Sequence, residues 1–132
     1  MLDNPFLALL GAELRKWEDG LCEWELEIAP HHLNTQGSLQ GGVIATLLDV
    51  ACGYSGSYSN SESEEVRAAT ISLTVHFMAK ATKGSLIARA RRVGGGRRIF
   101  FSDAELIGEE GVIVATASGS FRRHNLARDA RN

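Results

Sequence analysis

The stretch NTQGSLQGGVIATLLDVACGY, residues 34–54, decides the fold of this 132-residue chain. It opens with polar residues and glycines, and from Gly41 to about Tyr54 it continues as an apolar run of helical length. Apolar residues lie on nearly all sides of that helix, so we expect other structure to enclose it. The only charged residue in the run is Asp49, and a carboxylate in apolar surroundings is costly unless it is paired or used.

The start of this helix carries a second signal. Gly41 and Gly42 leave backbone N–H groups open where the helix dipole favours negative charge, and together with Asp49 they indicate acyl-transfer chemistry. At about 1.5 Å per residue, Asp49 lies roughly 12 Å along the axis from Gly41. Groups that serve one carbonyl must each approach it to about 3 Å. One helix cannot supply both, so we expect a site shared across a dimer, with Gly41 from one chain and Asp49 from the other.

The first thirty residues predict two further elements. Asn4-Pro5 is typical of a helix start, and Gly11 should end that helix. Residues 21–28 alternate between apolar and acidic side chains, which predicts a strand with one buried face. Its wet face should carry three acids, Glu23, Glu25 and Glu27.

The second half of the chain contains strand signals only. After a polar loop at residues 58–65, the predicted strands occupy residues 71–77, 86–93, 97–107 and 112–121. Short turns between them imply an antiparallel meander. The expected fold class is α+β, a curved antiparallel sheet wrapped around one long central helix, with a short N-terminal helix. The single domain spans residues 1–132, and residues 124–132 should form a flexible tail.

Composition limits the kind of protein. With 44% hydrophobic and 23% charged residues, the chain has the make-up of one soluble globular domain. A net charge of −2 gives no reason to expect nucleic acid or an anionic membrane as partner. Residues 1–11 lack a basic segment, so no secretory signal is predicted, and we expect a cytoplasmic protein whose Cys22 and Cys52 are free thiols. The histidines lack metal-ligand spacing, so no metal is expected.

The pattern Asn34-x-x-Gly37-x-x-x-Gly41-Gly42 followed by Asp49 resembles that of the hotdog-fold acyl-CoA thioesterases, in their PaaI-like (phenylacetate-pathway) branch. The leading helix with Gly11 and the residues Gly96-Arg97-Arg98 add to the resemblance, which covers nearly the whole chain. It implies a hotdog fold, an acyl-CoA substrate, no cofactor other than the CoA of the substrate, and a homodimer or homotetramer. Those proteins commonly have His before the Gly pair. Gln40 stands there in this chain, and it can donate a hydrogen bond but cannot shuttle a proton at neutral pH.

The resemblance assigns roles that each have a plainer alternative. Asp49 would be the base or the nucleophile, or only an acid bonded to a neighbouring hydroxyl. Gly41 would donate its N–H to the developing oxyanion, with Gly42 beside it at the substrate, or the pair would only allow a tight entry into the helix. Gln40 would add a contact to the carbonyl. Asn34 would orient Asp49 or the attacking water, or bond its own loop.

Three further residues complete the predicted site. Thr70 falls where the family often has a Ser or Thr near the acid. Arg97 and Arg98 follow a glycine turn and would meet the CoA phosphates, although solvated charges on a strand edge are as good an interpretation.

Two other functions remain open. A hotdog hydratase or dehydratase would need a His paired with an acid, and none lies near Gly41. A non-catalytic acyl-CoA-binding or regulatory protein would keep the arginines but lack a working acid, and Asp49 argues against it.

Overall fold

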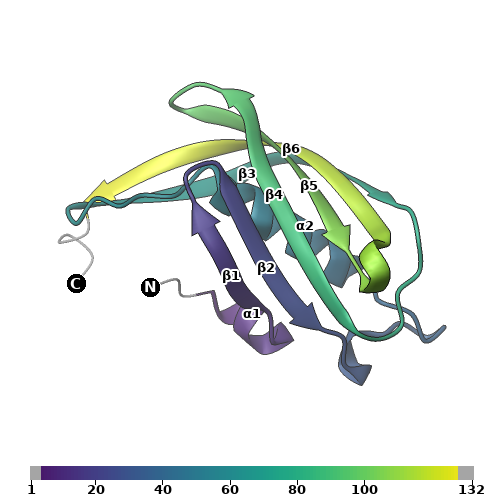
Figure 1. The fold of residues 1–132 in the computed structure, drawn as a ribbon. Coiled ribbons are helices and arrows are strands. Elements are labelled where there is room, and N and C mark those ends of the chain that lie inside the picture. The colour runs from purple at the N-terminus through teal and green to yellow at the C-terminus, as the bar shows by residue number, and fades with distance from the viewer. Residues whose placement is uncertain (1–3, 128–132) are drawn as a thin grey trace.

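Six antiparallel strands form one curved sheet, and a long helix lies in its concave face (Figure 1). The computed structural model of the chain describes residues 4–127. The helices are α1 (Pro5–Leu10) and α2 (Gly41–Ser55), with short 3-10 turns at Pro30–His32 and Glu109–Gly111. The strands are β1 (Glu13–Glu18), β2 (Leu21–Glu27), β3 (Glu64–Phe77), β4 (Ser85–Gly95), β5 (Ile99–Ile107) and β6 (Ile113–Ala127).

The predicted helices are confirmed. Asn4 Oδ1 accepts a hydrogen bond from the N–H of Leu7 at 3.2 Å and starts α1, and Gly11 ends it with a φ of 86°. α2 packs against every strand of the sheet. Its buried side chains lie in one core with those of the sheet. The sequence prediction of a curved sheet around one central helix, the hotdog arrangement, is therefore correct.

The strand order differs from a simple meander. The order is β1-β2-β4-β5-β6-β3, so the meander holds for β4, β5 and β6 but not for β3, which pairs with β6. The connection between β3 and β4, residues 78–84, is longer than the two to five residues usual in a hairpin. This longer connection lets β3 lie at the far edge of the sheet, while β4 pairs with β2.

Strand β1 is absent from the sequence prediction. It pairs with β2 as an edge strand, and only Trp17 among its side chains is partly buried. Because β1 buries so little, its sequence ELRKWE has no clear alternation to detect.

The prediction that Glu23 faces water is wrong. Its exposed fraction is 5%, because arginine side chains from the neighbouring strands cover it. Arg89 Nε donates a hydrogen bond to Glu23 Oε2 at 2.7 Å, and Arg15 Nε lies 3.8 Å from Oε1. The buried carboxylate is thus paired on both sides.

The ends of β3 and β6 are also longer than predicted. β3 begins at Glu64, inside the expected loop, and β6 continues to Ala127, inside the expected flexible tail. Residues 64–68 and 123–127 pair with each other beyond the end of β5. Cross-strand pairing therefore orders residues whose composition alone predicts a loop and a tail. The rest of the tail, residues 128–132, lies outside the described residues.

Candidate active site

Asp49 and Thr70 are joined by a short hydrogen bond. The Thr70 hydroxyl donates to Asp49 Oδ1 at 2.6 Å, linking the middle of α2 to the middle of β3. Asp49 is partly buried and Thr70 is exposed. With one oxygen bonded to Thr70, the other carboxylate oxygen of Asp49 remains available to water or substrate.

Gly41 and Gly42 form the first turn of α2, as predicted. The carbonyl oxygen of Gln40 accepts hydrogen bonds from the N–H groups of Val43 and Ile44. Within residues 4–127, the N–H groups of Gly41 and Gly42 have no backbone acceptor, as expected for the first turn of a helix. These two N–H groups can bind an anionic oxygen.

Gln40 precedes this turn in an extended conformation, with φ −63° and ψ 134°. Its side chain is exposed and makes no capping hydrogen bond to the helix. This conformation leaves the amide of Gln40 able to contact a ligand at the start of α2, although it cannot transfer a proton there.

His32 stabilises the loop that leads into α2. Its ring is buried; Nδ1 accepts a hydrogen bond from the N–H of Ala29 at 2.9 Å, and Nε2 donates to the carbonyl oxygen of Leu10 at 2.7 Å. The carbonyl oxygen of His32 in turn accepts from the N–H of Gln40 at 2.9 Å. The sequence gives no sign of this role, because the partners of His32 lie on α1 and in the adjoining loop.

Asn34 stabilises its own loop in this structure. Its Oδ1 accepts hydrogen bonds from the N–H of Gln36 at 2.8 Å and of Ser38 at 3.2 Å, an Asx-type turn. No hydrogen bond joins it to Asp49 within residues 4–127.

The free edge of the sheet borders this region. β3 pairs on one side only, with β6, and Ile71 and Phe77 on it are 55% and 59% exposed. The Phe77 ring lies beside Gly41, because a Cβ added to Gly41 would be 3.4 Å from Phe77 Cε1. The proposed acid and the proposed oxyanion donor thus both lie next to β3, eight residues apart on one helix.

The predicted phosphate-binding arginines lie in a separate region. Arg97 and Arg98 are exposed in the turn between β4 and β5. Next to the turn is an open depression of about 250 Å³ near the end of α2. Its polar and charged lining residues within residues 4–127 are Asp19, Tyr58, Arg92, Arg97, Arg123 and Asn125.

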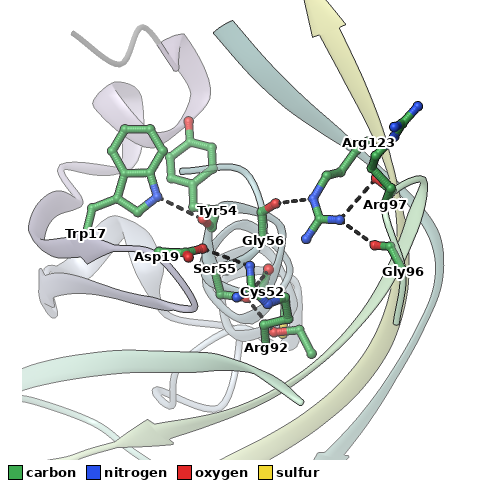
Figure 2. Close-up of polar contacts among 11 residues, drawn as sticks. Trp17, Asp19, Cys52, Tyr54, Ser55, Gly56, Arg92, Gly96, Arg97 and Arg123 are labelled. Carbon is green, nitrogen blue, oxygen red and sulfur yellow. Dashed lines mark hydrogen bonds and ion pairs between the residues drawn. The ribbon is translucent and has the colours of Figure 1, made fainter. Parts of the chain in front are cut away.

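Two arginines of the depression have internal partners. Arg92 Nη1 lies 2.9 Å from Asp19 Oδ1, and the Arg123 guanidinium bonds backbone carbonyls (Figure 2). Burial lowers the pKa of the Arg123 guanidinium, and the nearby charge of Arg92 lowers it further. The sequence indicates no role for Arg123, because its partners are carbonyl oxygens on distant segments.

The two thiols are poor candidates for catalysis. Both cysteines are free and buried. Burial raises the pKa of the Cys52 thiol to about 12 and raises that of Cys22 as well. Both thiols therefore stay protonated at neutral pH, and a protonated thiol is a weak nucleophile.

Residues 4–127 contain neither a candidate metal site nor a helix that could span a membrane. No group of three or more His, Cys, Asp and Glu side chains there could hold a metal ion. No helix in the same residues is long and apolar enough to cross a membrane.

Comparison with known proteins supports the resemblance. A family model described as the thioesterase superfamily matches residues 36–115, more than half of the chain. A Pseudomonas aeruginosa protein provisionally named an esterase is 34% identical over 120 residues, covering 89% of this chain and 87% of that protein. A Halobacterium salinarum protein with a similarly provisional esterase name is 31% identical over 131 residues, with coverages of 91% and 85%.

Solved structures share the fold. A mutant form of the phenylacetic acid degradation protein PaaI from Thermus thermophilus has a TM-score of 0.78 at 26% identity, over 90% of this chain and 98% of that one. A Haemophilus influenzae thioesterase has a TM-score of 0.81 at 21% identity, over 92% and 83% of the two chains. At 21% identity, the similarity to the Haemophilus influenzae thioesterase shows a shared fold alone.

Proposed function

Because the chain belongs to the thioesterase superfamily, we propose that it hydrolyses acyl-CoA thioesters to CoA and a carboxylic acid. The observation that carries the proposal is the hydrogen bond between Asp49 and Thr70 at the free edge of the sheet. An acid held there by one oxygen can act on a substrate that enters from the edge.

The proposed site lies between two chains of a homodimer. Within one chain, α2 separates Asp49 from Gly41 by eight residues, about 12 Å along the axis, which is too far for both to serve one carbonyl. A long edge strand with exposed apolar side chains can pair with a second copy. β3 has these properties, since Ile71 and Phe77 on it are exposed. Pairing of two chains here would bring Gly41 of one chain toward Asp49 of the other.

The chemical roles follow from the groups available. The N–H of Gly41 would stabilise the negative charge that develops on the thioester oxygen, and Gln40 would add a second hydrogen bond. Asp49 would either take a proton from the attacking water or attack the carbonyl carbon itself to form an anhydride that water then opens. In both routes the C–S bond breaks, the CoA thiolate leaves and takes up a proton, and the acyl group gains the oxygen of water.

The CoA part of the substrate would lie toward the turn between β4 and β5. Arg97 and Arg98 are exposed there, and a guanidinium can contact phosphate through two N–H groups at once. The contact with the phosphates would add to binding without taking part in the chemical step.

The first test is thiol release from a panel of acyl-CoAs by the wild type and by Asp49→Asn. The asparagine keeps the shape and the bond to Thr70 but removes the charge. We expect kcat to fall by about 10²–10⁴-fold, the usual contribution of an acid–base residue. Equal turnover by the two proteins would remove Asp49 from the mechanism. Tight binding of acyl-CoA by the wild type without turnover would instead favour the non-catalytic binding protein.

The second test addresses the shared site. Gly41→Pro removes the proposed donor, and each single variant should be inactive alone. In a randomly mixed population half of the dimers carry one chain of each kind, and each of these has one intact site. Mixing Asp49→Asn with Gly41→Pro should therefore restore about a quarter of wild-type activity. No recovery in mixtures that ultracentrifugation shows to be dimeric would contradict a site built from two chains.

A further inference from the structure

Arg123 holds the turn between β4 and β5 through three successive backbone carbonyls. Its Nη1 donates hydrogen bonds to the carbonyl oxygens of Gly96 at 2.6 Å and Arg97 at 3.1 Å. Its backbone N–H donates to the carbonyl oxygen of Arg98 at 2.7 Å. One residue therefore fixes the backbone of the whole turn.

The same side chain connects the turn to the end of α2. Arg123 Nε donates to the carbonyl oxygen of Gly56, the residue after the helix, at 2.6 Å. The guanidinium carbon lies 4.6 Å from the centre of the buried Phe100 ring. Figure 2 shows the guanidinium between Gly56 on one side and Gly96 and Arg97 on the other. Arginine reaches the two sides from different nitrogens, Nε and Nη1, whereas the three donors of a lysine all lie on one nitrogen.

Arg97 and Arg98 differ from Arg123 in having free side chains. Both are exposed, and within residues 4–127 neither forms an ion pair. The turn that carries them contains Gly96 and directly follows Gly95, the last residue of β4, whose φ is 112°. Glycines lose much conformational entropy when the backbone around them becomes ordered. If Arg123 orders this turn beforehand, binding of an anion by Arg97 and Arg98 does not have to offset that entropy.

We propose that Arg123 is a positioning residue for substrate binding, which fixes the β4–β5 turn so that Arg97 and Arg98 meet the phosphate groups of CoA. This inference rests on the proposed function, since acyl-CoA is the ligand that brings the phosphates. It differs from a purely structural role in one respect. Loss of Arg123 should weaken binding only of ligands that carry the phosphorylated nucleotide.

The experiment compares an acyl-CoA with the matching acyl-pantetheine, which has the same thioester but no nucleotide. For Arg123→Met and Arg123→Lys we expect KM for the acyl-CoA to rise about tenfold, the value of one charge-assisted contact, with kcat within about twofold of wild type. The kcat/KM for the acyl-pantetheine should stay within about twofold. Arg122→Met, which removes the same charge one residue earlier on β6, is the matched control. It should leave KM and kcat unchanged for both substrates. Equal losses on the two substrates would overturn the inference.

A binding measurement separates this inference from the proposed function. Calorimetric titration with free CoA and with free pantetheine needs no turnover, and circular dichroism confirms that each variant is folded. CoA should bind about tenfold more weakly to Arg123→Met than to wild type, even if no thioester is hydrolysed. Unchanged CoA affinity in a folded Arg123 variant rejects the inference, whatever the activity.

A double-mutant cycle tests whether Arg123 acts through the turn. When Arg97 and Arg98 are both replaced by methionine, the added substitution Arg123→Met should change CoA affinity by less than about twofold. A further tenfold loss in that background would mean that Arg123 contacts CoA itself or acts elsewhere, and the positioning role would be rejected.

Discussion

The hydroxyl of Thr70 donates a 2.6 Å hydrogen bond to Oδ1 of Asp49, and this bond links the central helix to the edge strand. The resemblance to the PaaI-like thioesterases places a Ser or Thr near the acid. The structure brings Thr70 and Asp49 together across these two elements.

Replacing Thr70 tests whether this bond orients the acid. Thr70→Val keeps the shape of the side chain and removes the donor. A hydrogen bond to a charged group contributes about 1.5–3 kcal/mol, so kcat for thioester hydrolysis should fall about tenfold or more. Thr70→Ser retains the hydroxyl and should keep most of the activity. A valine variant as active as the serine variant would mean that Asp49 needs no fixed orientation.

Gly41→Pro tests the oxyanion donor without removing the helix. Proline is favoured at the first helical position, and the extended conformation of Gln40 suits a residue before proline. Loss of one oxyanion donor typically lowers kcat by about 10²–10³-fold.

Gly41→Ala is the control, because it adds the same Cβ beside Phe77 at 3.4 Å but keeps the N–H. It should retain much more activity than the proline variant. If the two variants are equally impaired, crowding against Phe77 and not the lost N–H explains the effect.

Two glycines near the end of α2 should respond oppositely to alanine. A Cβ at Gly56 would lie 2.3 Å from the Phe100 ring, so Gly56→Ala should lower the free energy of unfolding by about 1–3 kcal/mol. Outside the backbone of α2, the nearest atom to a Cβ at Gly53 would be Ala68 Cβ at 3.8 Å, so Gly53→Ala should raise the free energy of unfolding by about 0.5–1 kcal/mol through helix propensity. Urea unfolding measures both, and a neutral Gly56→Ala would mean that the Phe100 ring can move aside.

Because its two thiols are buried, we expect the protein to lose stability against unfolding at alkaline pH. Burial raises the pKa of Cys52 from 9.0 to about 12, and that of Cys22 is raised as well. Above pH 9 an unfolded chain ionises its thiols while the folded chain keeps them protonated, so the unfolded state is favoured progressively as the pH rises toward 12. The free energy of unfolding should fall between pH 9 and pH 11.

The matched variant for this prediction is Cys52→Ala. It is expected to be less stable than wild type at pH 8 because of the cavity, but to lose less stability between pH 9 and pH 11. If Cys52→Ala loses as much stability between pH 9 and pH 11 as the wild type does, groups other than Cys52 cause the loss.

The parts of the fold that sequence could predict are those with local signals. The apolar run around Asp49 predicts α2, and Asn4 and Gly11 predict both ends of α1. The strand β1 could not be predicted because nearly all of its side chains are exposed. The burial of Glu23 depends on Arg15 and Arg89, which reach it from two neighbouring strands, and such cover has no signal in the sequence of β2.

In the candidate site, too, the residues with a local sequence signal could be predicted and those that depend on distant partners could not. Asp49, Gly41 and Gln40 belong to one continuous segment, so the sequence could predict that the first two lie on α2 and that Gln40 directly precedes it. Asn34 bonds its own loop, which was the plainer of the two interpretations. The role of Arg123 has no signal in the sequence, because its acceptors are backbone carbonyls and any residue can supply a carbonyl.

The ribbon formed by the ends of β3 and β6 has a consequence for local opening. In the strand ladder, residues 64–67 and 124–127 pair only with each other there, without support from β5. Their amide protons should therefore be the first of the sheet to exchange in deuterated water. The opening should stop at Arg123, whose three bonds to the β4–β5 turn hold the strand in place. Fraying of residues 124–127 would then leave the bonds from Arg123 to the carbonyl oxygens of residues 96–98 intact.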